Sequence, residues 1–220
     1  GKHHAPNYKS AVTEFRPQVT KSLLKRLATN KTMGPYSWSG NVNDLPFTSC
    51  GVNPIGAVPY KYEPGRARAC DDPWINAAID PPHFKMTALE QLRRDAYPCC
   101  SWAKTDVEAA FPVMHVRQTD LPWMLFAWYH PDDTTFSGTD QDCLYVHNYA
   151  NFGPRPWPFE FTMLMLYTNI AGKAQGIDIP AAFIDDNIHT DNLLTLQTLA
   201  PAYYDHLDKA GMKDKQAKRE

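Results

Sequence analysis

Three aspartates stand where the sequence predicts that β-strands end. Asp106 closes one strand-like run, and Asp185 and Asp186 follow an apolar run further along the chain. Carboxylates at the end of a buried strand are costly to bury unless a cation neutralises them. If two such strand ends meet at one edge of a sheet, their oxygens could hold two hard divalent ions, as in metal-assisted phosphoryl transfer. For the pair at 185–186 alone, a turn capped by its own side chains is the favoured interpretation.

Cysteine and histidine show no spacing typical of a metal site. The five cysteines include no Cys-x-x-Cys pair, and neighbouring Cys99 and Cys100 cannot easily share one zinc ion. The eight histidines are scattered and form no His-Glu-x-x-His motif. We therefore expect reduced cysteines and an intracellular protein, and the sequence does not choose between nucleus and cytoplasm.

The composition predicts a folded chain of nearly neutral charge. Its 220 residues are 43% hydrophobic, which suffices for a core in one domain or in two small lobes. With 22 Lys+Arg against 24 Asp+Glu, the formal net charge of −2 excludes a histone-like polycation, so nucleic acid would bind at a local patch. No apolar run approaches the ~18 residues of a membrane helix, and the first residues carry no export signal, so no membrane partner is expected.

The first part of the chain is rich in proline and predicts irregular structure around a few short elements. Apolar residues at helical spacing predict a helix near Val19–Thr29. A strand pair is expected at Ala57–Tyr62 and Arg66–Cys70, turned by Pro64-Gly65. A Thr-x-x-Glu capping box predicts a further helix over Ala88–Tyr97.

The remainder of the chain predicts strands and then helices. A helix is expected near Pro158–Ala171 with Gly172 as its stop, and another over Asn192–Ala210 that Pro201 could break. Between them, 179–189 predicts a hairpin with an acidic tip. The expected strands are Ser101–Asp106, Val113–Arg117, Trp123–Tyr129 and Cys143–Asn148. Helices alternating with antiparallel strands favour an α+β fold.

Four short motifs follow one another in a particular order. They are Asp106-x-x-x-Ala110-Phe111, then Phe152-Gly153 with Pro158 and Phe161 behind it, then Phe183-x-Asp185-Asp186, and finally Gly211 followed by Lys218. This order resembles the palm of reverse transcriptases from retrotransposons, closest in character to the DIRS group and similar to Ty3-like elements. Upstream, the segment 53–59 and the basic stretch before Asp71 and Asn76 resemble the fingers of the same family.

The resemblance covers about residues 30–220 and implies a fold. That fold is an α+β arrangement of fingers and palm, in which an antiparallel sheet packs on helices, and a thumb is not expected. It divides the chain into an N-terminal helical segment (1–33), a fingers-like region (34–100) and a palm-like catalytic region (101–220).

The resemblance also implies a two-metal centre. Asp106 and Asp185 would hold two Mg²⁺ or Mn²⁺ ions, and the backbone carbonyl of Val107 would complete the ion on the nucleotide side. Asp186 would shape the local field and ligate only in part. Lys218 matches the family lysine near the leaving pyrophosphate, although a lysine in a solvated, basic tail is the alternative.

Further residues match positions that contact the nucleotide and template. Phe111 falls at the steric-gate position, where an aromatic ring clashes with a ribose 2′-hydroxyl, and a core aromatic is the alternative that need not exclude it. Phe152 and Gly153 would lie under the nascent base pair, and Arg155 would contact template or triphosphate unless it is a solvated loop residue. Arg66 and Arg68 are candidates for the β- and γ-phosphates, or ordinary surface residues of a strand.

The implied activity is that of an RNA-directed DNA polymerase. Its partners would be an RNA or DNA template with primer, deoxynucleoside triphosphates, and further domains of a longer polyprotein such as a thumb and RNase H. Pro112 and Trp157 depart from the family pattern, because proline removes a backbone donor and tryptophan is bulky where small residues are common. The alternative is a domesticated, catalytically silent domain that serves as an interaction module in a larger assembly.

Overall fold

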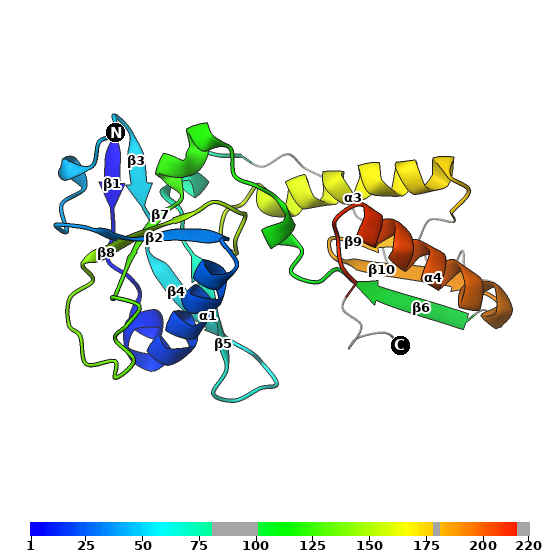
Figure 1. Ribbon diagram of the computed structural model, residues 1–220, viewed down its shortest axis with the longest axis horizontal. Coiled ribbons are helices and arrows are strands. Elements are labelled where there is room, and N and C mark those ends of the chain that lie inside the picture. The colour runs from blue at the N-terminus through cyan, green and yellow to red at the C-terminus, as the bar shows by residue number, and fades with distance from the viewer. Residues whose placement is uncertain (81–100, 178–180, 215–220) are drawn as a thin grey trace. The chain divides into compact units, whose positions relative to one another are not determined.

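The computed structural model describes residues 1–80, 101–177 and 181–214 (Figure 1). Contacts between residues divide the chain into two compact units. The first unit comprises Gly1–Asp80 and Met114–Arg155, and the second comprises residues 81–113 and 156–220. The division into an N-terminal helical segment (1–33), a fingers-like region (34–100) and a palm-like region (101–220) rests on sequence motifs and stays a prediction.

The first unit is built on a five-stranded mixed sheet in the order β1-β3-β7-β8-β2. The β1–β3 and β3–β7 pairs are parallel, whereas β7–β8 and β8–β2 are antiparallel. Every residue of β7 and β8 is buried, and both strands consist largely of apolar and aromatic residues, a composition that suits a strand covered on both faces. The strands are β1 (Lys2–His4), β2 (Thr32–Ser37), β3 (Cys50–Val52), β7 (Leu125–Trp128) and β8 (Cys143–His147).

Helix α1 (Arg16–Ala28) supplies one side of the core of this unit. Val19 and Leu23, four residues apart on α1, are buried in the same cluster as Trp128 and Tyr145 of the sheet. The indole Nε1 of Trp128 donates to Thr20 Oγ1 at 3.0 Å, so the polar atom of this buried ring has a partner. The helix predicted near Val19–Thr29 is thereby confirmed.

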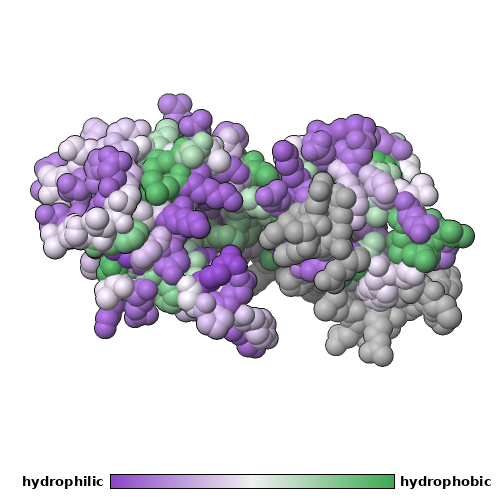
Figure 2. Space-filling view, turned by 60° about the horizontal axis from the view of Figure 1, so that its bottom comes forward, coloured by the Kyte–Doolittle hydropathy of each residue, from purple (hydrophilic) through white to green (hydrophobic). Residues whose placement is uncertain are grey.

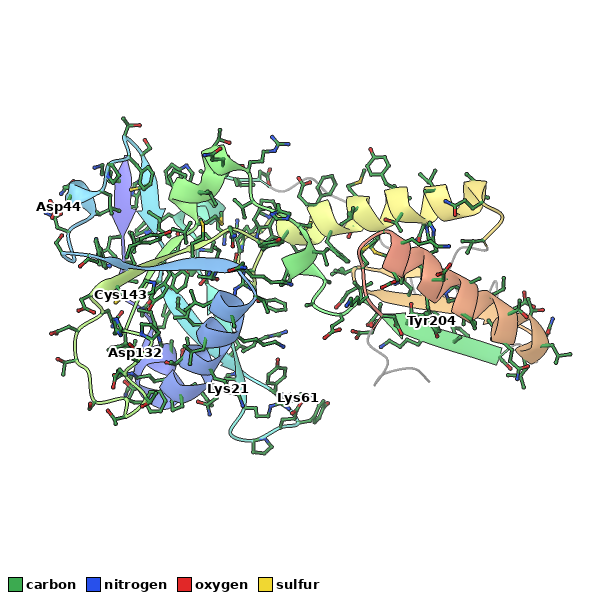
Figure 3. The ribbon with its side chains drawn as sticks, viewed as in Figure 1. Lys21, Asp44, Lys61, Asp132, Cys143 and Tyr204 are labelled. Carbon is green, nitrogen blue, oxygen red and sulfur yellow. The ribbon has the colours of Figure 1, made fainter. Side chains whose placement is uncertain are left out.

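A two-stranded antiparallel hairpin projects from the first unit, with Lys61 near its outer end (Figure 3). It pairs β4 (Ile55–Pro59) with β5 (Ala67–Asp71), and Val58 lies opposite Arg68. The connection contains Gly65 at φ 77°, a left-handed conformation that glycine adopts without steric cost. The predicted strand pair turned by Pro64-Gly65 is confirmed.

In its described part, the second unit packs helices α3 (Trp157–Ala174) and α4 (Leu193–Lys209) on a three-stranded antiparallel sheet (Figure 1). The strands are β6 (Ser101–Asp106), β10 (Asp186–Asp191) and β9 (Ala181–Phe183), with β10 in the middle. Phe161 of α3 and Leu207 of α4 are fully buried. The predicted hairpin with an acidic tip is confirmed as β9 and β10.

Short helical segments connect these elements in the described part of the chain. They are η1 (Ser10–Glu14), η2 (Val42–Asp44), η3 (Trp74–Ala77), η4 (Phe111–Val113) and η5 (Gln118–Trp123). The strand predicted at Val113–Arg117 is wrong. Phe111–Val113 forms a 3₁₀ turn, and residues 114–117 contribute one isolated bridge, from His115 to Tyr149. Pro112 lacks the N–H that a strand pairing would use, which favours the turn.

Two predicted helix limits also change, and one prediction lies outside the described residues. Helix α3 continues past Gly172 to Ala174, because Gly172 is a packing residue: a Cβ there would lie 3.0 Å from His206 Nε2. Pro201 lies inside α4 without ending it, and the nearby residues Ala200 and Tyr203 of the helix are buried. The helix predicted over 88–97 falls outside the described residues.

The surface in view in Figure 2 is mostly hydrophilic, with apolar residues gathered in a few separate groups. Within the described part of the chain, no helix combines the length and apolar character that a membrane crossing requires.

Candidate active site

The register of β6 and β10 brings two aspartates face to face. Asp106, the last residue of β6, is the direct cross-strand partner of Asp186, the first residue of β10. Directly opposed residues of an antiparallel pair project from the same face of the sheet, so the two carboxylates share one face. Asp106 is only 5% exposed, which places this pair at a partly buried end of the sheet. The predicted meeting of acidic strand ends is thus present in the second unit.

A tight turn presents Asp185 next to this pair. Ile184 and Asp185 connect β9 to β10, and Ile184 adopts φ 55°. A β-branched residue in the left-handed region is unusual and costs on the order of 1–3 kcal/mol. The backbone carbonyl of Asp185 accepts a hydrogen bond from the N–H of Val107 at 2.9 Å, and Val107 is 1% exposed. The turn is therefore fixed to the residue that directly follows Asp106.

The segment after α4 lies against the same end of β6. The N–H of Asp106 donates to Asp214 Oδ1 at 3.2 Å, and the N–H of Glu108 donates to the carbonyl of Lys213 at 2.6 Å. Asp214 is 108 residues from Asp106 in sequence, so no local pattern marked it. A fourth carboxylate consequently stands beside the three predicted ones.

A lysine pairs with the second aspartate of the acidic pair. Lys104 Nζ lies 3.1 Å from Asp186 Oδ1, and the two side chains are 39% and 35% exposed. Lys104 was not predicted as a site residue. The signal was available in part, because residues 104 and 106 alternate onto the same face of one strand.

The oxygen atoms at this end of the sheet are of the type that binds hard divalent cations. Carboxylate and carbonyl oxygens are the ligands that Mg²⁺ and Mn²⁺ prefer. Among the described residues, no three or more His, Cys, Asp or Glu side chains gather closely enough to hold a metal ion by themselves. A metal centre here would accordingly combine the carboxylates of Asp106 and Asp185 with a backbone carbonyl such as that of Val107.

Phe111 makes the core contact that was expected as an alternative to a gate. Its ring meets the ring of Phe161 edge-on, with centroids 6.1 Å apart and an interplanar angle of 79°. Phe111 is half-buried, so part of the ring also faces outward. Packing on α3 fixes the ring in place, and its role toward a ribose stays a prediction.

The nucleotide-binding candidates in the first unit fall into two groups. Arg68 and Phe152 lie together, with the guanidinium 5.5 Å from the centre of the Phe152 ring. Arg66 instead forms an ion pair with Glu63 and is mostly exposed, near the ring of Tyr60. The structure therefore associates Arg68, rather than Arg66, with the Phe152-Gly153 motif.

The loop from Phe152 to Arg155 is held by hydrogen bonds that the sequence did not reveal. The N–H of Asp71 donates to the carbonyl of Phe152 at 2.9 Å. The side chain of Asn76 donates to the carbonyl of Gly153 at 3.1 Å and accepts from the N–H of Arg155 at 2.8 Å. A strand and a 3₁₀ turn distant in sequence thus fix the backbone of this loop.

A buried histidine lies behind this loop. His147 Nε2 is 3.0 Å from Asp71 Oδ2, and its Nδ1 is 3.0 Å from Thr32 Oγ1. Burial lowers the pKa of His147, and Asp71 opposes that shift. A neutral ring that donates to Asp71 and accepts from Thr32 satisfies both of its nitrogens.

No protein-family model and no curated protein matches this sequence. Solved structures of foamy-virus protease–reverse transcriptase do match its fold. One, described as a complex with double-stranded DNA, has a TM-score of 0.70 and 15% identity over 100% of this chain and 33% of its own. The native protease–reverse transcriptase of prototype foamy virus has a TM-score of 0.66 and 14% identity. That match covers 96% of this chain and 24% of the viral protein.

The chain has a reverse-transcriptase-like fold. A further complex of the foamy-virus enzyme with double-stranded DNA has a TM-score of 0.70 and 14% identity over 100% of this chain and 39% of its own. The chain thus spans between 24% and 39% of the length of these three proteins. At such identities the likeness establishes the fold.

The reverse-transcriptase-like fold accounts for the order of the motifs. Within the second unit it gathers Asp106, Asp185 and Asp186 at one end of a sheet, and it adds Lys104 and Asp214. The remaining predicted residue, Lys218, lies outside the described residues.

Proposed function

We propose that this chain is the fingers-and-palm portion of an RNA-directed DNA polymerase from a retroelement. The direct pairing of Asp106 with Asp186, beside a strained turn that carries Asp185, supports the proposal most. Strain concentrates at functional sites, and neighbouring carboxylates at a buried strand end need a compensating cation. The reverse-transcriptase-like fold also supports the proposal, because the four sequence motifs resemble those of a reverse-transcriptase palm.

The reaction would be transfer of a deoxynucleotide to a primer 3′-hydroxyl on an RNA or DNA template. Asp106 and Asp185 would hold two divalent cations, which when bound supply charge neutralisation for in-line displacement at phosphorus. Phe111 would exclude a ribose 2′-hydroxyl, and Arg68 would bind phosphate oxygens of the triphosphate. The loop fixed by Asn76 would set the position of Phe152 against the base pair.

Primer extension on poly(rA)/oligo(dT) with Mg²⁺ or Mn²⁺ tests this function. We expect Asp106→Asn and Asp185→Asn each to lower extension by about a thousandfold or more, since metal-assisted charge stabilisation supplies several kcal/mol. The control is Asp205→Asn, an equally conservative change at an exposed aspartate of α4 that pairs with Lys209. Undiminished extension by Asp185→Asn would show that the active site is elsewhere.

A folded chain that binds Mn²⁺ but extends no primer would leave two explanations. Either the polymerase needs further domains of a longer polyprotein, or the domain is a catalytically silent module of a larger assembly. Primer extension by a longer chain that includes downstream sequence would distinguish them.

A further inference from the structure

An ion pair within the acidic cluster has no assigned role. Lys104 Nζ and Asp186 Oδ1 are 3.1 Å apart, on the face of the sheet that also carries Asp106. The cross-strand partner of Lys104 is Ile188, so Asp186 is its diagonal neighbour on β10. Diagonal neighbours are about 7–8 Å apart at Cα, a distance that a lysine can span.

Fold stability does not explain this pair. Both side chains are more than a third exposed, and ion pairs with that exposure contribute little to folding. The pair has a clearer consequence for charge. Asp106 and Asp186 are direct cross-strand partners, and like charges in that position repel each other. A cation held on Asp186 relieves that repulsion.

The pair also limits what Asp186 can ligate. A carboxylate oxygen that accepts a hydrogen bond from an ammonium group is oriented toward it and is partly neutralised. We propose that Lys104 is a positioning residue that holds Asp186 out of the coordination shell, so that divalent cations are bound by Asp106 and Asp185. This inference rests on the proposed function, because it presupposes a cation at the acidic cluster.

Calorimetric titration of the full chain with Mn²⁺ tests the inference. The titration measures the affinity for Mn²⁺ in the absence of nucleotide and template. The variants are Lys104→Gln, Asp186→Asn and the double substitution, with Lys104→Arg as the charge-preserving variant. Lys173→Gln, on α3 of the same unit, is the matched control for loss of one lysine. Thermal unfolding without metal verifies that each variant is folded.

We expect Lys104→Gln to tighten Mn²⁺ binding about tenfold, because it releases a full carboxylate beside a divalent ion. In the Asp186→Asn background the same substitution should tighten binding no more than about threefold, since only the lysine's own repulsion is removed. Lys104→Arg and Lys173→Gln should remain within about twofold of the unchanged chain.

Two results would overturn the role of Lys104 while leaving the proposed function intact. One is unchanged affinity in Lys104→Gln. The other is equal tightening with and without Asp186, which would reduce the lysine to a nonspecific charge. Failure of the unchanged chain to bind Mn²⁺ would instead overturn the metal centre, and the role of Lys104 with it.

Discussion

Gly153 shows how strictly one residue position can be constrained. Its φ of 136° lies in a region that side-chain-bearing residues rarely adopt, and a Cβ there would lie 2.0 Å from the carbonyl oxygen of Asp71. The same backbone accepts the hydrogen bond from Asn76 and adjoins Phe152. The close approach of the Asp71 backbone therefore requires glycine here, and the predicted place of Gly153 under a base pair stays a prediction.

We predict that Gly153→Ala lowers the free energy of unfolding by about 2 kcal/mol or more, because steric overlap adds to backbone strain. Gly65→Ala is the matched control: it also has positive φ, 77°, but its Cβ would meet nothing within 4 Å. Strain alone should cost that variant about 1 kcal/mol. Denaturant titration of both proteins makes the comparison, and equal losses would refute the overlap with Asp71.

At the scale of elements, a chain of buried polar contacts joins one helix to three strands. Arg26 of α1 donates to Thr32 of β2 at 3.1 Å, and Thr32 contacts His147 of β8, which contacts Asp71 of β5. Both side chains of the final pair are less than 10% exposed. Since every buried polar group in such a network must keep its partner, the network sets how the hairpin and the sheet meet.

The lowered pKa of His147 predicts a pH dependence of stability. Below pH 6.5, the ordinary pKa of histidine, His147 takes up a proton in the unfolded chain but not in the folded chain. The contribution of His147 to stability is therefore present in full above pH 6.5 and falls as the pH decreases toward the pKa in the folded chain. The slope contributed by this residue is at most about 1.4 kcal/mol per pH unit.

Denaturant unfolding between pH 7.5 and 5 measures this effect. His147→Gln should flatten the dependence, whereas His130→Gln, at an exposed histidine, should retain it. Equal slopes in both variants would mean that another group accounts for the acid sensitivity.

The existence of an element was predictable where the local pattern decides it, although its limits shifted: α1 begins at Arg16 rather than near Val19, and β4 spans Ile55–Pro59 rather than Ala57–Tyr62. The helix α1, the hairpin β4–β5 and the strands β6 and β8 follow from spacing, turn residues and apolar runs that lie within each segment. The errors occurred where a neighbour decides: Gly172 extends α3 because His206 packs on it, and the segment after Pro112 turns instead of pairing.

Among the described residues, each of the two units buries apolar side chains of its own. The cluster around Trp128 consists only of residues of the first unit, and Phe161, Tyr203 and Leu207 are buried in the second. Each unit is discontinuous in sequence, so neither can be recognised as a contiguous stretch.

We predict that core substitutions affect the two units separately. Trp128→Phe removes the bond to Thr20 and part of a fully buried ring, and it should cost about 2 kcal/mol. Tyr203→Phe removes the 2.9 Å bond to Asn169 in the other core and should cost about 1 kcal/mol. Hydrogen exchange should show lost protection in β7 and β8 for the first and in α4 for the second. Loss throughout the chain in either variant would indicate one cooperative unit.

The sequence by itself determined that aspartates stand at or beside the ends of strands and in what order the motifs follow. Asp106, Asp185 and Asp186 were identified from local apolar runs and from their resemblance to a palm, because such patterns depend on neighbours along the chain. Only the tertiary structure decided the register that opposes Asp106 to Asp186, the pairing of Lys104 with Asp186, and the contact of Asp214 with residue 106. These depend on how distant segments pack, and one-dimensional spacing carries no record of that packing.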